Sequence, residues 1–177
     1  MSLGLYLHIP YCFSKCRYCD FYSHPGERGV PEAYVDALLR ELSRFAPEAP
    51  LQPDTLYFGG GTPSLLCPEQ AKRLIDAARP MPGAEITLEA NPETVTEESL
   101  AGFREAGVNR ISFGVQSARD TQLRTLGRPH TAKQARAAFA AARRAGFANI
   151  SGDIMLALPH YTEAEFDETL ELIEGGG

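Results

Sequence analysis

Short apolar runs alternate along the chain with longer stretches in which apolar residues recur at helical spacing. The short runs are rich in β-branched and aromatic residues, which is typical of strands, whereas a period near 3.6 residues predicts helices. Five strands are predicted in this way, over Leu3–His8, Thr55–Phe58, Glu85–Glu89, Arg110–Val115 and Asn149–Met155.

Helical pattern fills the intervals between these strands. After Pro31, which suits a first-turn position, the apolar residues Tyr34, Leu38, Leu42 and Phe45 follow at helical spacing. Three later helices each begin after a threonine cap and stop at a glycine. They extend from Thr96 to Gly107, from Thr131 to Gly146 and from Thr162 to Gly175, and the last two begin with capping boxes.

Strict alternation of strand and helix predicts an α/β fold in which right-handed crossovers join parallel strands. About five βα units are too few for a closed eight-stranded barrel, which takes about 250 residues. An open sheet with a topological switch point is the other option. The chain stops at Gly175–Gly177, where the next strand would begin. We therefore expect residues 1–177 to form one domain that is the N-terminal portion of a longer protein.

Composition narrows the class of protein. The 177 residues are 44% hydrophobic and 23% charged, which is ordinary for a globular domain. A net charge of −6 argues against a nucleic-acid partner, which would require a basic face. No apolar stretch approaches the roughly 18–20 residues of a membrane span. Met1 to Tyr11 does not resemble an export signal, so we expect a cytoplasmic protein with reduced thiols.

Three cysteines close to the N-terminus are the strongest chemical signal. Cys12, Cys16 and Cys19 have the spacing C-x3-C-x2-C. Three thiolates can hold three corners of a 4Fe-4S cube, a cluster that normally takes four cysteines, and the fourth iron is then open to a ligand. A zinc site completed by His24 or His8 is an alternative. A disulfide fits poorly, because three clustered thiols cannot pair evenly.

The fourth cysteine, Cys67, lies far from this triad, beside Pro68 at a predicted helix start. We interpret it as a small buried hydrophobic residue.

Polar residues and glycines also gather where the predicted strands end, which is where parallel α/β proteins bind ligands. The run Gly59–Gly61 with Thr62 follows the second strand, and its glycines would expose backbone N–H groups to a ligand carboxylate. Glu89 ends the third strand, Gln116 follows the fourth and Asp153 lies in the fifth. We expect these residues to share a rim with the cysteines.

Together the motifs resemble the radical S-adenosylmethionine (SAM) superfamily. The evidence is the cysteine triad after a first strand, followed by Gly-Gly-Gly-Thr-Pro at 59–63. Within the superfamily, four segments resemble the oxygen-independent coproporphyrinogen III oxidase group. They are YLHIPYC at 6–12, LEANP at 88–92, ISFGVQ at 111–116 and LGRPH at 126–130. The resemblance implies a partial, open βα barrel that binds a 4Fe-4S cluster and SAM.

The same resemblance implies a chemistry and a set of residue roles. In such enzymes the open iron binds the amino and carboxylate groups of SAM, and the reduced cluster splits a carbon–sulfur bond to release a 5′-deoxyadenosyl radical. By position, Tyr6 would lie beside cluster-bound SAM as a catalytic residue, and Tyr18 would face the adenine. The remaining implied SAM contacts are Gly60, Gly61 and Thr62 at the methionine end, Glu89, and the second-SAM residues Gln116, Arg128 and Asp153. Packing in the strand for Tyr6, and a surface position for Arg128, are the alternatives.

One departure divides the group. The oxidases continue the cluster motif to a fourth cysteine two residues after the third, and this chain has Phe21 there. In this respect it resembles the HemW-type haem chaperones, which implies binding of haem and its transfer to an acceptor protein. The alternative is oxidative decarboxylation of the propionates of coproporphyrinogen III to vinyl groups. Either function implies haem or a porphyrinogen as partner, together with an electron donor such as flavodoxin or ferredoxin.

Overall fold

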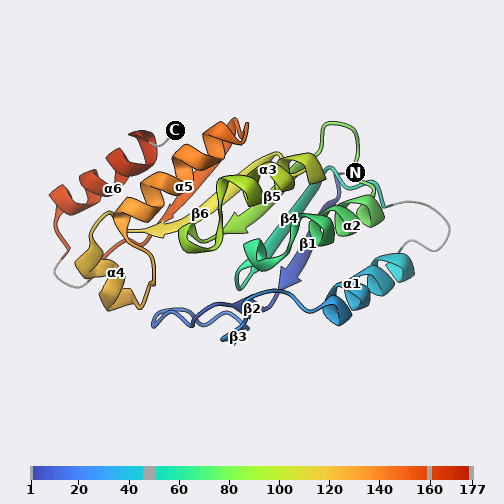
Figure 1. The fold of residues 1–177 in the computed structure, drawn as a ribbon, viewed down its shortest axis with the longest axis horizontal. Coiled ribbons are helices and arrows are strands. Elements are labelled where there is room, and N and C mark those ends of the chain that lie inside the picture. The colour runs from blue at the N-terminus through green and yellow to red at the C-terminus, as the bar shows by residue number, and fades with distance from the viewer. Residues whose placement is uncertain (1, 46–50, 159–160, 176–177) are drawn as a thin grey trace.

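Five strands form one parallel sheet in the computed structural model, which describes residues 2–45, 51–158 and 161–175. Their order across the sheet is β1 (Gly4–Ile9), β4 (Thr55–Gly60), β5 (Glu85–Ala90), β6 (Arg110–Gln116) and β7 (Asn149–Ile154), and every pairing is parallel. All five predicted strands are confirmed, with ends that shift by no more than two residues. Their carboxyl ends all meet at one edge of the sheet, next to the β2–β3 segment (Figure 1).

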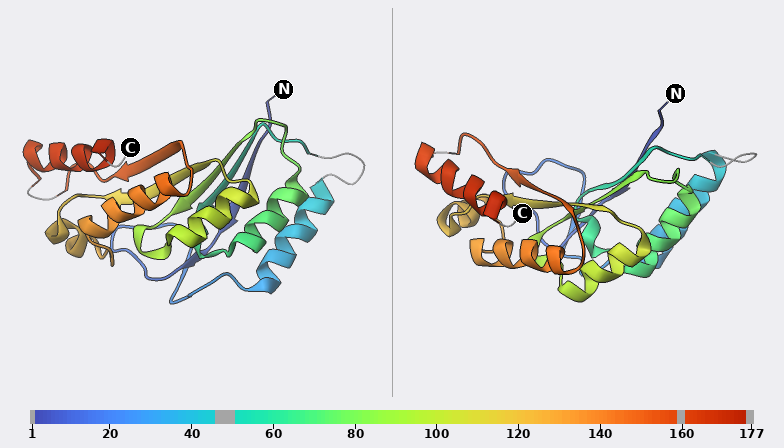
Figure 2. Two further views of the ribbon diagram at one scale, coloured as in Figure 1. Left: turned by 45° about the horizontal axis from the view of Figure 1, so that its top comes forward. Right: turned by 90° about the horizontal axis from the view of Figure 1, so that it is seen from above.

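The helices follow the same progression along one face of the sheet (Figure 2). They are α1 (Glu32–Phe45), α2 (Pro68–Ala78), α3 (Glu97–Ala106), α5 (Ala132–Arg144) and α6 (Glu163–Gly175), and each packs against the next. Neither strand order nor helix order reverses within the described part of the chain, so this sheet contains no switch point. The expected partial, open βα barrel is therefore confirmed.

Local capping explains where these helices begin and end. The Thr96 hydroxyl accepts a hydrogen bond from the Ser99 amide at 3.1 Å, and Gly107 ends α3 with φ of +112°, a conformation that glycine adopts without strain. Thr131 with Gln134 caps α5, and Thr162 with Glu165 caps α6, as predicted. Capping contributes roughly 1 kcal/mol per helix.

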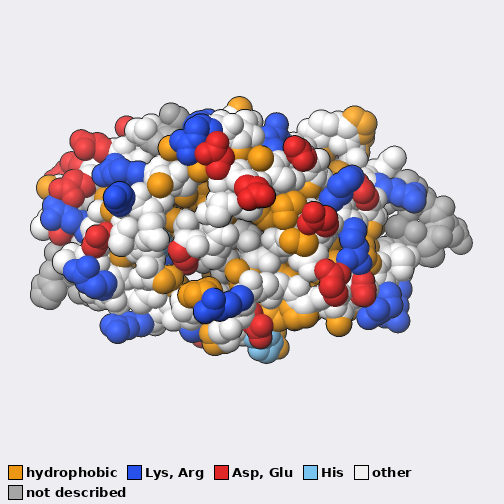
Figure 3. Space-filling model, viewed as in Figure 1, with side chains coloured by type: hydrophobic (Ala, Val, Ile, Leu, Met, Phe, Trp, Pro, Cys, Tyr) orange, Lys and Arg blue, Asp and Glu red, His pale blue; other side chains and the backbone are white. Residues whose placement is uncertain are grey.

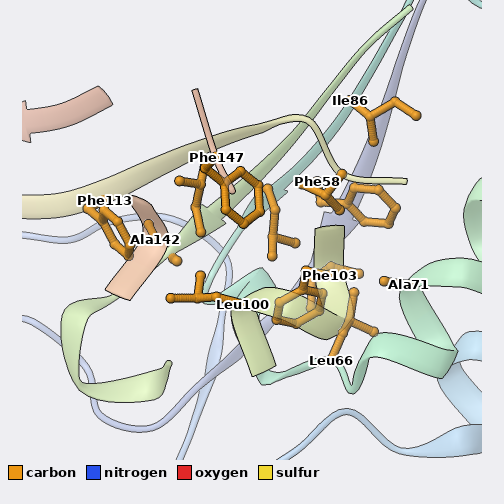
Figure 4. Packing of buried hydrophobic residues seen from close by; sticks show 14 of the residues in the cluster. Phe58, Leu66, Ala71, Ile86, Leu100, Phe103, Phe113, Ala142 and Phe147 are labelled. Atoms are coloured by element: carbon orange, nitrogen blue, oxygen red, sulfur yellow. The ribbon is translucent and has the colours of Figure 1, made fainter. Parts of the chain in front are cut away.

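Buried apolar side chains fill the space between the sheet and the helices (Figure 4). Phe58 and Phe113 from the strands meet Phe103 and Phe147 from α3 and the segment after α5, and all four are at most 2% exposed. Phe45, which we placed on the apolar face of α1, is instead 73% exposed. It is the last residue of α1, and the buried residues of that helix are Val35 and Leu42.

Several short elements were not predicted. They are β2 (Tyr11–Cys12), β3 (His24–Pro25), the 3-10 turns η1 (Pro63–Leu65) and η2 (Pro92–Thr94), and α4 (Asp120–Leu126). None of them is long enough to show a hydrophobic period. All lie near the carboxyl ends of the strands or in the loops that follow them, which is the region of the predicted site.

The surface seen in Figure 3 intersperses basic and acidic side chains over the helices. Within the described residues, none of the helices has the length and apolar character needed to cross a membrane.

Candidate cofactor-binding site

The cysteine triad lies on a loop that folds back on itself after β1. The His24 amide donates to the Pro10 carbonyl at 2.7 Å, and the Glu27 amide donates to the Cys12 carbonyl at 3.2 Å, which fixes the two ends of the loop. All three thiols are free; Cys12 is buried, and Cys16 and Cys19 are half-buried. The loop thus presents three unpaired thiols on one side of the strand ends.

One pocket contains this loop and the carboxyl ends of four strands. Every predicted site residue except Tyr6 lines it: Cys12, Cys16, Tyr18, Cys19, Gly60, Gly61, Thr62, Glu89, Gln116, Arg128 and Asp153. These residues span more than 140 positions of sequence, from Cys12 to Asp153. The fold therefore assembles the predicted rim, and the residue roles assigned to it stay predictions.

The arrangement of the thiols bears on the kind of metal centre. Among the described residues, no three His, Cys, Asp or Glu side chains converge on a point that could hold a single metal ion. His8 instead contacts the Tyr22 carbonyl through Nε2 at 3.1 Å, and His24 packs against the Tyr22 ring. The Cys3His zinc alternative thus lacks support from these side chains. A cubane contacts its three thiolates through three different irons, so it does not require them to converge.

Two hydrogen-bond donors face the thiols. The Thr62 hydroxyl lies 3.6 Å from the Cys12 sulfur and is buried, and Arg128 Nη1 lies 3.4 Å from the Cys16 sulfur. Donors of this kind stabilise thiolates and tune the potential of an iron–sulfur cluster. Asn91 connects them, because it donates to the Thr62 hydroxyl and accepts from Arg128. Asn91 belongs to the LEANP segment at 88–92 but was not among the predicted site residues.

Arg128 is buried, at 9% exposed, so the alternative of a surface guanidinium is wrong. Its Nη2 donates to Asn91 at 2.6 Å and to the Gly114 carbonyl at 2.5 Å. Burial alone would lower the pKa of Arg128, but the neighbouring acidic groups of Tyr18 and Cys16 outweigh it, and the pKa is raised. Arg128 is therefore a fixed positive charge in the pocket wall.

The amides of the glycine run are not exposed as expected, whereas the contact of Gly60 and Gly61 with the methionine end of SAM stays a prediction. The Gly60 amide donates to Glu89 at 3.2 Å and the Gly61 amide donates to the Ile9 carbonyl at 2.9 Å, so neither N–H is free for a ligand. Close packing explains the glycines instead. A Cβ at Gly61 would lie 2.6 Å from the Tyr11 carbonyl oxygen and 2.9 Å from the Cys12 sulfur, and Gly60 has φ of +115°. The run lets β4 approach the cysteine loop.

Two carboxyl groups on the pocket wall have raised pKa values. Desolvation raises the pKa of Glu89, and the Asp153 carboxylate raises it further, against hydrogen bonds from Tyr57 and Gly60. Asp153 is exposed when the whole residue is considered. Desolvation of its carboxyl group by the pocket wall nevertheless raises its pKa, and a hydrogen bond from Ser112 only partly opposes this shift. Raised carboxyl pKa values at strand ends are typical of ligand sites, where a bound cationic group would stabilise the charged form.

The remaining predicted contacts differ in their surroundings. Desolvation raises the pKa of Tyr18 to about 12, and the Arg128 charge opposes this shift. Gln116 has φ of +68° at an irregularity in the β6–β7 pairing, which turns the chain at the rim.

Tyr6 lies outside the pocket lining and is 53% exposed. Its ring stacks on Tyr57, whose hydroxyl donates to Glu89 at 2.7 Å. Tyr57 was missed, although its place on the polar side of an alternating strand was a usable signal.

Cys67 is a correction. It is exposed, not buried, because it occupies the N-cap of α2, where its amide donates to the Gln70 side chain at 3.0 Å. The helix start inferred from Pro68 is confirmed. Cys67 is absent from the pocket lining.

Comparison with known proteins gives the family. The model of the radical SAM superfamily matches residues 6–173. The chain belongs to the radical SAM superfamily. It is 39% identical to the heme chaperone HemW of Haemophilus influenzae, covering 97% of this chain and 48% of that protein. It is 43% identical to the heme chaperone HemW of Escherichia coli, covering 89% and 43% respectively. The chain thus spans about half the length of the curated relatives it matches.

A solved structure agrees with this assignment. Coproporphyrinogen III oxidase (HemN) from Escherichia coli, described as a radical SAM enzyme, superposes with a TM-score of 0.87 at 30% identity. The match covers 99% of this chain and 42% of that protein. The predicted resemblance to the oxidase-like group is confirmed.

Membership of the superfamily implies a 4Fe-4S cluster and SAM, and the pocket fits both groups. Three free thiols on one loop, two of them contacted by a hydroxyl or a guanidinium, form a donor set for a cluster with an open iron. Arg128 Nε is buried without a hydrogen-bond partner among the described residues, so the wall retains a donor for a ligand.

Proposed function

We propose that this chain is the cofactor-binding part of a cytoplasmic haem chaperone of the HemW type, which binds a 4Fe-4S cluster, SAM and haem and passes haem to an acceptor protein. The observation that carries the proposal is Phe21. It stands where the oxidases have a fourth cysteine, and it lines the pocket while 68% exposed. Identity of about 40% to two proteins named as HemW heme chaperones supports the same assignment.

The roles of the residues follow from the pocket. Cys12, Cys16 and Cys19 would hold the cluster, whose open iron supplies a site for SAM and for its reductive cleavage. Thr62 and Arg128 would donate hydrogen bonds to two of the thiolates and thereby tune the cluster potential. A small electron carrier, flavodoxin or ferredoxin, would supply the electron.

The pocket wall would hold SAM. Glu89 and Asp153 lie where carboxylates could accept hydrogen bonds from its polar groups, with Gln116 at the rim. Tyr18 would cover the adenine and Tyr6 would border the cofactor from β1, by position in the family motifs. These assignments agree with the raised carboxyl pKa values, which a bound cation would return toward their ordinary range.

Oxidative decarboxylation of coproporphyrinogen III is the second candidate, and the TM-score of 0.87 to HemN favours it. One experiment separates the two functions. The full-length protein, reconstituted with its cluster, is incubated anaerobically with SAM, a reductant and coproporphyrinogen III, and separately with haem followed by an apo-haemoprotein. We expect haem binding and transfer without any divinyl product. Formation of the divinyl porphyrinogen would establish the oxidase and overturn the proposal.

A further inference from the structure

Glu93 and His130 form a buried pair of side chains outside the pocket lining. His130 is 2% exposed and the Glu93 side chain is 12% exposed. Glu93 lies in η2, directly after β5, and His130 lies between α4 and α5. His130 Nδ1 is 3.2 Å from Glu93 Oε2, an ion-pair distance, and neither atom has a hydrogen-bond partner among the described residues.

The contacts of His130 join three elements of the fold. His130 Nε2 is 3.2 Å from the Val115 carbonyl oxygen, which can only accept, so Nε2 carries a hydrogen. His130 Nδ1 faces Glu93 Oε2 at an ion-pair distance of 3.2 Å. Through these two contacts the pair connects η2, β6 and the turn after α4.

That turn contacts the cysteine loop. We name residues 127–130 the Arg128 turn; it carries the guanidinium that donates to Cys16. Just before it, the Leu126 carbonyl accepts from the Arg17 amide at 2.9 Å, next to Cys16 in sequence. Gly127, with φ of +74°, lies against Arg17 so closely that a Cβ there would be 3.1 Å from its side chain. The position of the Arg128 turn thus determines how Cys16 is held.

We propose that the Glu93–His130 pair is a positioning device that holds the Arg128 turn against Cys16 and so sets the geometry of the cluster and SAM pocket. The inference rests on the cofactor part of the proposed function and is independent of haem transfer. Both residues act through Arg128 and the cysteine loop. Loss of contacts that orient metal ligands typically costs about 10-fold to 100-fold in metal affinity or activity.

The test uses variants that separate hydrogen bonding from volume. Glu93→Ala removes the partner of Nδ1, and His130→Phe keeps a ring but no polar atom. Glu93→Gln is the rescue, because its amide N–H can donate to the Nδ1 of a neutral imidazole. Gln70→Ala is the matched control: Gln70 is a buried side chain that donates to the Val30 carbonyl at 2.9 Å, away from the pocket.

The first readout is hydrogen exchange of the protein without cofactors. We expect the Arg17 and Arg128 amides to exchange about tenfold faster in Glu93→Ala and His130→Phe than in the wild type. Glu93→Gln should restore protection, and Gln70→Ala should leave these two amides unchanged. Unchanged exchange at both amides in Glu93→Ala, or equal acceleration in Gln70→Ala, would overturn the inference.

The second readout is SAM affinity of the reconstituted protein. We expect the dissociation constant to rise about tenfold in Glu93→Ala and His130→Phe. In an Arg128→Gln background each substitution should have a smaller further effect, because both act in part through Arg128. Unchanged affinity in the single variants, or additive losses in the double variants, contradicts the positioning role. If the wild-type protein binds no SAM, the proposed function is refuted instead. The hydrogen-exchange measurement still tests whether the Glu93–His130 pair holds the Arg128 turn.

Discussion

At the scale of single residues, the pocket contains groups whose burial destabilises the protein without a ligand. Glu89 and Asp153 have raised pKa values, and the Cys16 thiol shares a donor with Asn91. Arg128 is buried, and its Nε has no hydrogen-bond partner in the described part of the chain. Groups of this kind are expected where a ligand completes the interactions, because they reduce the stability of the free protein.

Glu89→Gln tests this view through pH. The pKa of Glu89 is raised, so the folded state binds its proton more tightly than the unfolded state and wild-type stability falls as pH rises through the interval between the ordinary and the raised value. Glutamine does not titrate and can still accept from Gly60 and donate to Tyr57. We expect Glu89→Gln to gain up to about 1 kcal/mol at pH 8, allowing for solvent screening of a half-buried group.

Urea unfolding of the cofactor-free protein at pH 4 and pH 8 measures this gain. It should be near zero at the lower pH and larger at the higher one. The same variant should bind SAM more weakly once reconstituted. A stability difference that does not change between the two pH values would show that folding does not raise the pKa of the Glu89 carboxyl group.

At the scale of elements, the sequence predicts the strands and the helix caps because hydrophobic period and capping residues act locally. Thr96, Thr131 and Thr162 were recognisable without any knowledge of the tertiary structure. The seven-residue helix α4 was not, because it buries only Leu123 and Leu126 and is too short to be stable alone.

The same limit applies to the site. The cysteines and the strand-end residues were predictable because parallel strands bring their carboxyl ends together. The Glu93–His130 and Tyr57–Glu89 contacts were not, because each depends on how two elements distant in sequence pack. The burial of Arg128 and the exposure of Cys67 likewise depend on packing that no local pattern encodes.

The contact between β4 and the cysteine loop gives an element-scale prediction. Gly61→Ala places a Cβ against the Tyr11 carbonyl and the Cys12 sulfur, so the loop must move and Cys12 with it. We expect iron incorporation to fall by at least about half, since displaced ligands lose metal affinity steeply. Gly29→Ala is the control, because its Cβ would meet only the Leu65 carbonyl at 3.9 Å. Equal iron content in the two variants would refute the packing role of Gly61.

At the scale of the whole molecule, consecutive βα units bring the cysteine loop into contact with the Arg128 turn, which lies more than 100 residues away in sequence. Arg128 reaches Cys16 because each crossover adds the next strand on the same side, which carries the turn after β6 back over the loop after β1. The carboxyl ends of the strands and the cysteine loop then present the pocket to ligands. We propose that this pocket holds a three-cysteine cluster with an open iron.

Anaerobic reconstitution, followed by iron and sulfide analysis and by EPR of the reduced protein with and without SAM, tests that claim most directly. We predict about four iron and four sulfide per chain, and a spectrum that changes when SAM is added. Replacing Cys12, Cys16 or Cys19 with alanine should abolish loading, whereas Cys67→Ser, at an exposed helix cap, should leave it intact. Stoichiometric zinc without iron uptake, or a cluster whose EPR spectrum ignores SAM, would contradict the account.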